Sequence, residues 1–476
     1  MAYNKAMRNE RKLWLLFFLL LPLGFMAFPK AGAAPENLTL SLQNDRAALV
    51  NGDAQMELTA IQQALEFQTW RGDLWQRAGR LYMDQGDYQN ALHSFEKAQE
   101  LGQLEPLGQV WLSDMLIANG YSDVAKYVLQ SIHTDDVFIL LQAAALMAPL
   151  NDHEGLRQLL QKAYASEPTN SEVNYQMGIY LMTEDPGRAV AHFELAKRDQ
   201  SRKAAAAYLV ENIQQYGALE DHGEWYLYAG QALARINEWN AAFQAFSKAV
   251  QSLPDNAIAL ALLGESQFQL GLDGRQNLEK AWELDPEGEI TNGVLGIYYQ
   301  RQGNLEKALE HLRIAQKSNP SAAIWILESG RTLAAMGDLE KALTEFSLAV
   351  TVDEKNADLW RVLAEFCVLH RYQLEDVGLP AARQALTLEP DNPVLMDLLG
   401  TVYLQLADLD SAERFFLRAL ERDPEQAAIL IHLGQLNLIR EEKETAFGYL
   451  RRAEASARDW RLRDLANRML RENGAQ

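Results

Sequence analysis

The sequence lacks most of the features that catalytic and metal sites require. It has a single cysteine, Cys367, in 476 residues, so it can form neither an intramolecular disulfide nor a cysteine-based zinc site. It contains no glycine-rich phosphate loop, no His-Glu-x-x-His motif, no EF-hand loop and no Gly-x-Ser-x-Gly motif. Acidic pairs such as Asp135 and Asp136 fall at expected turns, where solvated helix ends explain them. We therefore expect no enzyme activity, no metal and no cofactor.

Positive charge is also scarce. The chain has 65 acidic and 44 basic residues, which gives a net charge of −21 at pH 7. Binding to nucleic acid or to an anionic membrane surface requires a cationic face, so we expect the body of the chain to bind neither. Hydrophobic residues make up 48% of the sequence, which is enough for a folded protein.

The apolar run Leu13–Phe28 lies close to the N-terminus. Four basic residues between positions 5 and 12 precede it, and small residues at 31–33 follow it, which is the order of a secretory signal. Its 16 residues fall short of the roughly 20 that cross a bilayer, so we expect cleavage after Ala33. An uncleaved membrane anchor is the alternative, and a buried helix of a cytosolic protein is a third. If exported, the remaining chain faces outward, with membrane contact only through residues 13–28 of an uncleaved anchor.

The rest of the chain is built from units of about 34 residues. Residues 393–426 show the pattern most clearly, as two amphipathic helices with small and aromatic residues on one face of each. These residues are Leu399, Gly400 and Tyr403 in the first helix and Ala412, Phe416 and Ala419 in the second. Pro424 ends the unit because proline lacks the N–H that a continuing helix needs. A single hairpin of this kind cannot bury its apolar face, so the unit must stack on copies of itself.

A second clear copy begins at Gly72. Its matching residues are Trp75, Gly79, Tyr82, Ala91, Phe95 and Ala98. Both units resemble the tetratricopeptide repeat, which has the pattern W-x2-L-G-x2-Y, then A-x3-F, then P. The resemblance covers roughly 400 residues. It implies an all-α fold, an α-solenoid of stacked antiparallel helix pairs wound into a right-handed superhelix. The first helix of each pair would line a concave groove.

The repeat phase predicts the organisation of the chain. A helix at 204–222 breaks the rhythm, because Glu211 stands where the repeat has glycine and no second helix follows. It is either a spacer helix or a decayed half-repeat. The predicted segments are a signal or anchor (1–33), a divergent partial repeat (34–71), a block of about four repeats (72–203), a spacer helix (204–222), a block of about seven repeats (223–460) and a capping helix (461–476).

The resemblance also implies which side chains face the groove. In the family, positions two, five, nine and twelve of each first helix do so. The positions carried onto this sequence include Arg80, Tyr175, Met182, Phe268, Ile297, Arg331 and Arg361. Apolar side chains in such a groove suit an extended peptide or an amphipathic helix. The Lys/Asn clamp by which some members hold a C-terminal carboxylate is not present, since Gln76 and Asp114 stand at two of its positions.

The histidines and the cysteine do not suggest a site of their own. His93, His192 and His311 fall near outer positions of second helices, so we expect them at the surface. Cys367 occupies an inward repeat position, so we expect a buried and unreactive thiol. The sequence thus predicts an exported scaffold that binds a protein or peptide partner of unknown identity through its concave face. The alternatives are an accessory subunit of a cell-envelope or polysaccharide-processing enzyme and a self-assembling structural protein.

Overall fold

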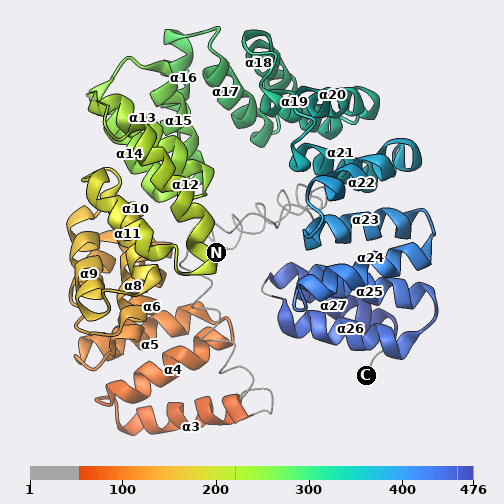
Figure 1. Ribbon diagram of the computed structural model, residues 1–476. Helices are drawn as coiled ribbons and strands as arrows, with labels where there is room; N and C mark the ends of the chain where they lie inside the picture. The colour runs from red at the N-terminus through yellow and green to blue at the C-terminus, as the bar shows by residue number, and fades with distance from the viewer. Residues whose placement is uncertain (1–52, 220, 458, 475–476) are drawn as a thin grey trace. The chain divides into compact units, whose positions relative to one another are not determined.

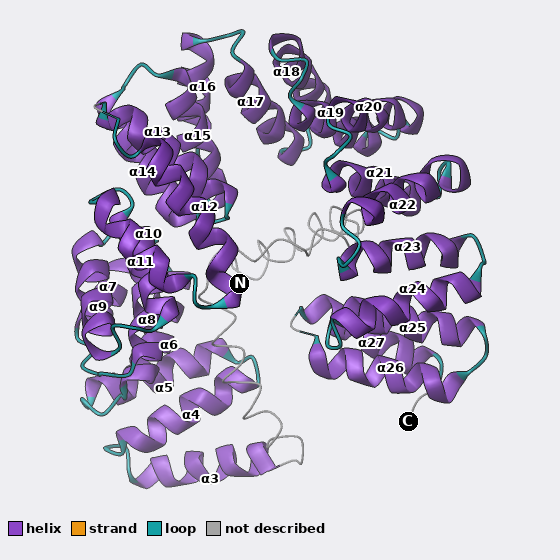
Figure 2. Cartoon of the chain, viewed as in Figure 1, coloured by secondary structure: helices purple, strands orange, loops and turns teal. Residues whose placement is uncertain are grey.

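The computed structural model describes residues 53–219, 221–457 and 459–474. These ranges contain 25 α-helices, one π-helix of five residues and no strand. Figure 2 shows the helices and the loops that join them. The predicted all-α fold is therefore confirmed. The predicted signal or anchor at 1–33 and the start of the divergent segment, up to residue 52, lie outside the described residues. No helix in the described ranges is long and apolar enough to span a bilayer.

The chain divides into two compact units, residues 30–277 and 278–476, which we describe separately. We call them the N-terminal unit and the C-terminal unit. The helices of the N-terminal unit are α3 (Asp53–Phe67), α4 (Gly72–Asp84), α5 (Tyr88–Glu100), α6 (Pro106–Ala118), α7 (Ser122–Gln130), α8 (Val137–Met147), α9 (His153–Ser166), α10 (Ser171–Leu181), α11 (Pro186–Ala196), α12 (Gln200–Tyr216), α13 (His222–Arg235), α14 (Trp239–Ser252) and α15 (Ala257–Gln269).

The boundary between the units falls inside α16 (Arg275–Leu284). The further elements of the C-terminal unit are α17 (Glu289–Arg301), α18 (Leu305–Ser318), α19 (Ala323–Ala335), α20 (Leu339–Val352), α21 (Ala357–His370), the π-helix η2 (Leu374–Gly378), α22 (Leu379–Leu388), α23 (Pro393–Gln405), α24 (Leu409–Arg422), α25 (Ala427–Ile439), α26 (Lys443–Ser456) and α27 (Trp460–Glu472).

Consecutive helices pack as antiparallel pairs in both units, for example α4 with α5 and α23 with α24 (Figure 1). In several pairs the two helices pack tightly because a glycine of the first helix faces an aromatic ring of the second. A Cβ atom on Gly79 would lie 2.8 Å from Cε1 of Phe95. Phe95, Ala91 and Ala98 are fully buried beneath this contact. The small and aromatic residues of the repeat thus form the core of each pair, as the sequence predicts.

Most pairs are joined by a residue in the left-handed conformation. Gly86 and Gly120, which stand 34 positions apart, have φ values of 76° and 84°. Glycine adopts this conformation without the steric cost that a Cβ atom would bring, and it closes the first helix of the pair. The repeat around Tyr372–Leu379 has two extra residues, and they fall in a region where the π-helix η2 precedes α22. Arg371 and Gln373 adopt positive φ values there.

A single helix, α12, interrupts the pairing in the N-terminal unit. It follows the pair α10–α11 and precedes the pair α13–α14, and it packs against α10, α11 and α13. The predicted spacer was placed at 204–222, but the helix begins at Gln200. It begins there because Asp199 caps it, with the Ser201 backbone N–H donating to Asp199 Oδ1 at 2.8 Å.

The described chain begins and ends with unpaired helices. At one end α3 packs against α4, with Leu58, Ile61 and Leu65 buried. At the other end α27 packs against α25 and α26, with Leu462 and Leu470 buried. Each of these helices covers the apolar face of the outermost pair, which is the usual role of an atypical terminal repeat.

Candidate binding groove

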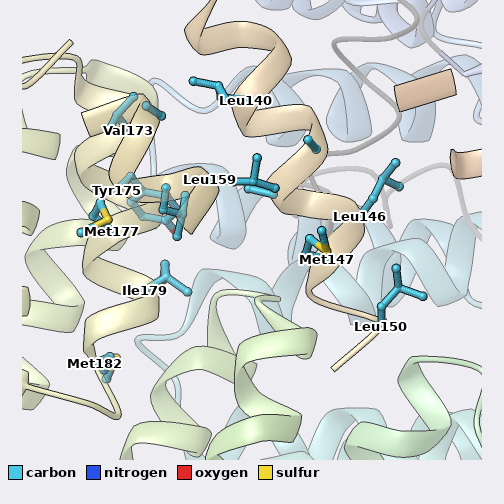
Figure 3. Packing of buried hydrophobic residues seen from close by; sticks show 14 of the residues in the cluster. Leu140, Leu146, Met147, Leu150, Leu159, Val173, Tyr175, Met177, Ile179 and Met182 are labelled. Carbon is cyan, nitrogen blue, oxygen red and sulfur yellow. The ribbon is translucent and has the colours of Figure 1, made fainter. Parts of the chain in front are cut away.

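A cavity of about 250 Å³ lies within the N-terminal unit. Residues of α8, α9, α10 and α14 line it, together with the turns that follow α8 and α10. Its apolar lining includes Phe138, Leu141, Leu146, Leu156, Ile179 and Ala241. Figure 3 shows Leu146 on α8 and Ile179 on α10 within the surrounding core. We call this cavity the groove; Phe138 in it is 36% exposed, which is high for a phenylalanine next to a core.

Helix α14 forms one wall of the groove by contacting the far ends of α8 and α10. Gln244 donates from Nε2 to Oδ1 of Asn151, in the turn after α8, at 2.5 Å. Lys248 donates from Nζ to Oγ1 of Thr183, after α10, at 3.2 Å, and it forms an ion pair with Glu184. These contacts join residues 64 to 93 positions apart, which regular stacking of neighbouring repeats does not bring together. The unpaired α12 directly precedes the pair α13–α14. The repeat is therefore interrupted just before the pair whose second helix forms this wall of the groove.

A network of four polar side chains lies beside the groove. Arg202 on α12 donates to both carboxylate oxygens of Glu172, at 2.7 and 3.0 Å. The guanidinium carbon of Arg202 lies 4.5 Å from the ring centroid of Tyr175. The Tyr175 hydroxyl donates to Oε1 of Glu238 at 3.1 Å. The network thus connects α10, α12 and the residue that precedes α14.

Burial shifts the pKa values of two groups in this network. Tyr175 is 1% exposed, and its burial, with the nearby Glu238 charge, raises the pKa of the hydroxyl well above its ordinary value. Burial also raises the pKa of Glu238, although the Arg202 charge and the Tyr175 hydrogen bond act in the opposite direction. Glu172 and Glu238 line the groove, whereas Arg202 and Tyr175 do not. The cation therefore lies behind the two carboxylates rather than in the open space.

The seven residues predicted for the concave face are divided between the two units. Arg80, Tyr175, Met182 and Phe268 belong to the N-terminal unit, and Ile297, Arg331 and Arg361 belong to the C-terminal unit. None of them lines the groove. Their binding role stays a prediction.

Three of the seven are buried within their own unit. Tyr175 and Met182 are 1% and 0% exposed, and Arg361 is 6% exposed. Arg361 donates to Asp358 at 3.0 Å and to the buried Glu365 at 2.6 Å. These side chains contact their own chain because neighbouring helices cover positions that the family pattern leaves open. Arg80, Phe268, Ile297 and Arg331 are half-buried.

The histidines differ from the sequence-based expectation. His93 is exposed as expected, but His192 is only 8% exposed and His311 is half-buried. The expected surface position is therefore wrong for these two. Nδ1 of His192 lies 2.8 Å from Oδ1 of Asn174, and Nδ1 of His311 lies 2.9 Å from Oδ1 of Asn292. The asparagine of the first helix holds the histidine of the second in both pairs.

Cys367 is fully buried, as predicted, and burial raises its pKa to about 12. A thiol with this pKa is protonated at neutral pH and is a poor nucleophile or metal ligand. In the described part of the chain, no group of three or more His, Cys, Asp or Glu side chains could hold a metal ion.

One segment of the sequence carries a signal for the groove. The segment Val137–Met147 is apolar on nearly all sides, more than one buried helix face requires. Part of that excess lines the groove. Glu238 and Lys248, in contrast, could not have been identified, because their partners are distant in the sequence.

The chain is similar to known repeat proteins. Family models described as tetratricopeptide repeat match residues 72–102, 294–366 and 398–459. Tetratricopeptide repeat protein 6 of Homo sapiens is 25% identical over 217 residues, which are 43% of this chain and 40% of that protein. The BBSome complex member BBS4 homolog of Drosophila melanogaster is 24% identical over 328 residues, 64% of this chain and 62% of that protein.

Another relative carries an enzyme name. Protein O-mannosyl-transferase TMTC1 of Homo sapiens is 26% identical over 202 residues, 41% of this chain and 23% of that protein. The chain thus spans less than two thirds of the length of each of these curated relatives.

Among solved structures, yeast Tom70 aligns with 92% of this chain and 96% of its own, at 14% identity and a TM-score of 0.41. The repeat models match where the glycine–aromatic pairs of the C-terminal unit and of α4–α5 lie. The helix pairs, the glycine turns and the matches of the family models together show that the chain contains tetratricopeptide repeats.

Proposed function

We propose that the protein is a scaffold that binds a segment of another protein in the groove of its N-terminal unit and catalyses no reaction itself. The observation that carries the proposal is that apolar side chains of α8, α10 and α14 border an open space of about 250 Å³. A groove that is already formed orders few residues on binding, which favours affinity. An amphipathic helix or an extended peptide is the occupant that such a surface suits.

The comparisons support a role in protein assembly. Tetratricopeptide repeat proteins bind protein partners, and one matched relative is named as a member of a complex, the BBSome. TMTC1 is named as a transferase, but the match covers 23% of its length. The name does not assign catalysis to the matched part.

A groove-blocking variant tests the proposal. Ala145 on α8 lines the groove and is half-buried, so Ala145→Trp fills the space. Ala207 on α12 is exposed and does not line the groove, so Ala207→Trp is the matched control. Partners captured by the wild-type chain and by Ala207→Trp, and identified by mass spectrometry, should be lost with Ala145→Trp at unchanged helicity. Equal capture by both variants would refute binding in the groove.

We further propose that Leu13–Phe28 directs export and that the repeats work outside the cytoplasm. The basic, apolar and small-residue order of residues 5–33 supports this proposal. Expression of the full chain, followed by fractionation and mass spectrometry of the N-terminal peptide, tests it. A chain found in the exported fraction, starting at Ala34 or retaining residues 13–28, agrees with export. An intact chain in the cytoplasmic fraction contradicts it.

A further inference from the structure

The carboxylates of the groove outnumber its cations. Four acidic residues line the space: Asp152, Glu172, Glu184 and Glu238. Among the described residues that line it, only Lys248 is a lysine or an arginine. Lys248 pairs with Glu184, and Arg202 pairs with Glu172 from outside the lining. Among the described residues, no lysine or arginine forms an ion pair with the other two carboxylates, those of Asp152 and Glu238.

Glu238 is held in place without being neutralised. The Tyr175 hydroxyl fixes its Oε1 at 3.1 Å, and Tyr175 is itself fixed by its burial and by the Arg202 guanidinium over its ring. Burial raises the pKa of this half-buried carboxylate, and the Arg202 charge opposes that rise without cancelling it. A cation that enters the groove would favour the ionised form and gain a charge-assisted hydrogen bond.

Apolar side chains surround this carboxylate within the same space. Phe138, Leu141 and Ile179 lie on α8 and α10, and Ala241 lies three residues after Glu238 on α14. The groove therefore offers apolar contacts and negative charge together. A purely apolar ligand would leave the carboxylates desolvated and unpaired, which is unfavourable.

We propose that the groove recognises a peptide segment in which a lysine or arginine is flanked by apolar residues, with the cation bound at Glu238. This inference rests on the proposed function, because it specifies the partner segment for the same groove. Glu172 contributes through its fixed negative charge, while Tyr175 and Arg202 position the two carboxylates. The aliphatic stem of the lysine or arginine lies along the apolar lining.

The test uses two labelled peptides and the full chain. The first peptide has the sequence Gly-Ser-Leu-Leu-Lys-Leu-Leu-Ser-Gly with a neutral dye, and the second has norleucine in place of lysine. Fluorescence anisotropy should show the lysine peptide binding roughly tenfold to a hundredfold more tightly, the usual range for a hydrogen bond to a charged group. Glu238→Gln keeps the shape of the side chain and should remove this preference. Glu224→Gln, at an exposed position of α13 outside the lining, should keep it.

The outcomes separate this inference from the proposed function. Equal binding of both peptides, with loss of both in Ala145→Trp, overturns recognition of a cation but retains the groove as a binding site. A lysine preference that survives in Glu238→Gln overturns the assignment to Glu238. If neither peptide binds, the inference is overturned, and capture of partners by wild type against Ala145→Trp decides the proposed function independently. Circular dichroism of each variant should match the wild-type chain, so that lost binding is not lost folding.

Discussion

Gly400 and Phe416 approach each other so closely that a Cβ atom on residue 400 would lie 2.6 Å from Cδ1 of the phenyl ring. The ring is fully buried between α23 and α24, so it has no free space to move into. The same contact recurs between Gly230 and Phe246 and between Gly330 and Phe346. This contact sets the distance between the two helices of a pair.

We predict that Gly400→Ala destabilises the chain by about 1–3 kcal/mol through overpacking. The control is Gly448→Ala on α26, where a Cβ atom would meet nothing within 4 Å. There the better helix propensity of alanine should stabilise the chain by up to about 1 kcal/mol. Urea unfolding followed by circular dichroism measures both changes. Equal stability of the two variants would contradict the packing described for the pair.

We predict that Ala407→Gly stabilises the chain by up to about 1 kcal/mol. Ala407 joins α23 to α24 with a φ of 61°, a conformation that costs an alanine roughly 1–2 kcal/mol and glycine almost nothing. Gly303 and Gly337 adopt φ values of 76° and 83° in equivalent turns. Thermal unfolding should show a higher midpoint for the variant. A lower midpoint would contradict this prediction. It would mean that the extra conformational entropy that glycine gives the unfolded chain outweighs the relief of backbone strain in the folded chain.

We predict that Arg361→Ala destabilises the C-terminal unit by about 3–5 kcal/mol, because it leaves the buried Glu365 without its partner. If Arg361 lay exposed on a concave surface, as the repeat pattern predicts, its substitution would leave the free energy of unfolding unchanged. Lys341→Ala, which removes an exposed pair with Asp338, should change the free energy of unfolding very little. In the double variant of Arg361→Ala and Glu365→Gln, part of the stability should return. No difference between the Arg361 and Lys341 variants would show that the buried pair does not stabilise the unit.

We predict that the contact between Asp397 and His432 makes stability depend on pH. Nδ1 of the buried His432 lies 2.8 Å from Oδ1 of Asp397. Burial alone would lower the pKa of His432, but the charge and hydrogen bond of Asp397 outweigh it, so the pKa is raised. Because the folded pKa exceeds the ordinary value of about 6.5, the contribution is complete below that value and declines as the pH rises through the folded pKa.

The measurement compares wild type with Asp397→Asn by urea unfolding between pH 5.5 and 9. The difference in free energy of unfolding should be largest at the acidic end and should shrink toward pH 9. His192 and His311 act in the opposite direction, since burial lowers the pKa of both, but their effect is the same in both chains and cancels. A pH-independent difference for Asp397→Asn would rule out a charged pair.

We predict that the Cys367 thiol does not react with iodoacetamide in the folded chain at pH 8. Its burial and its pKa of about 12 leave almost no accessible thiolate. In 8 M urea the same thiol should react at the rate of a free cysteine, which mass spectrometry can follow. Labelling of the folded chain at the rate seen in urea would show that the packing around Cys367 opens readily.

The repeat units could be predicted from the sequence because each one depends on contacts within about 34 residues. Gly79 and Phe95, or Ala412 and Phe416, carry the same small and aromatic pattern wherever it occurs, and the structure packs them as that pattern indicates. The left-handed turns at Gly86 and Gly120 follow from the same local logic. Burial of Cys367 follows from its place in the repeat.

The groove could not be predicted in the same way. The family pattern assumes that every first helix has an open face, whereas neighbouring helices cover Tyr175, Met182 and Arg361. Burial of His192 was missed because the pattern does not include its partner Asn174 on the preceding helix.

By itself, the sequence determined an all-helical chain of stacked hairpins, because glycine, alanine and aromatic spacing acts over one helix pair at a time. Only the tertiary structure decided where the groove lies. The unpaired α12 precedes a pair whose second helix, α14, contacts residues 151 and 184, which are 64 and more positions away from its own residues. Contacts of that range depend on how successive helices are oriented in space, and a repeating local pattern does not encode the effect of one extra helix.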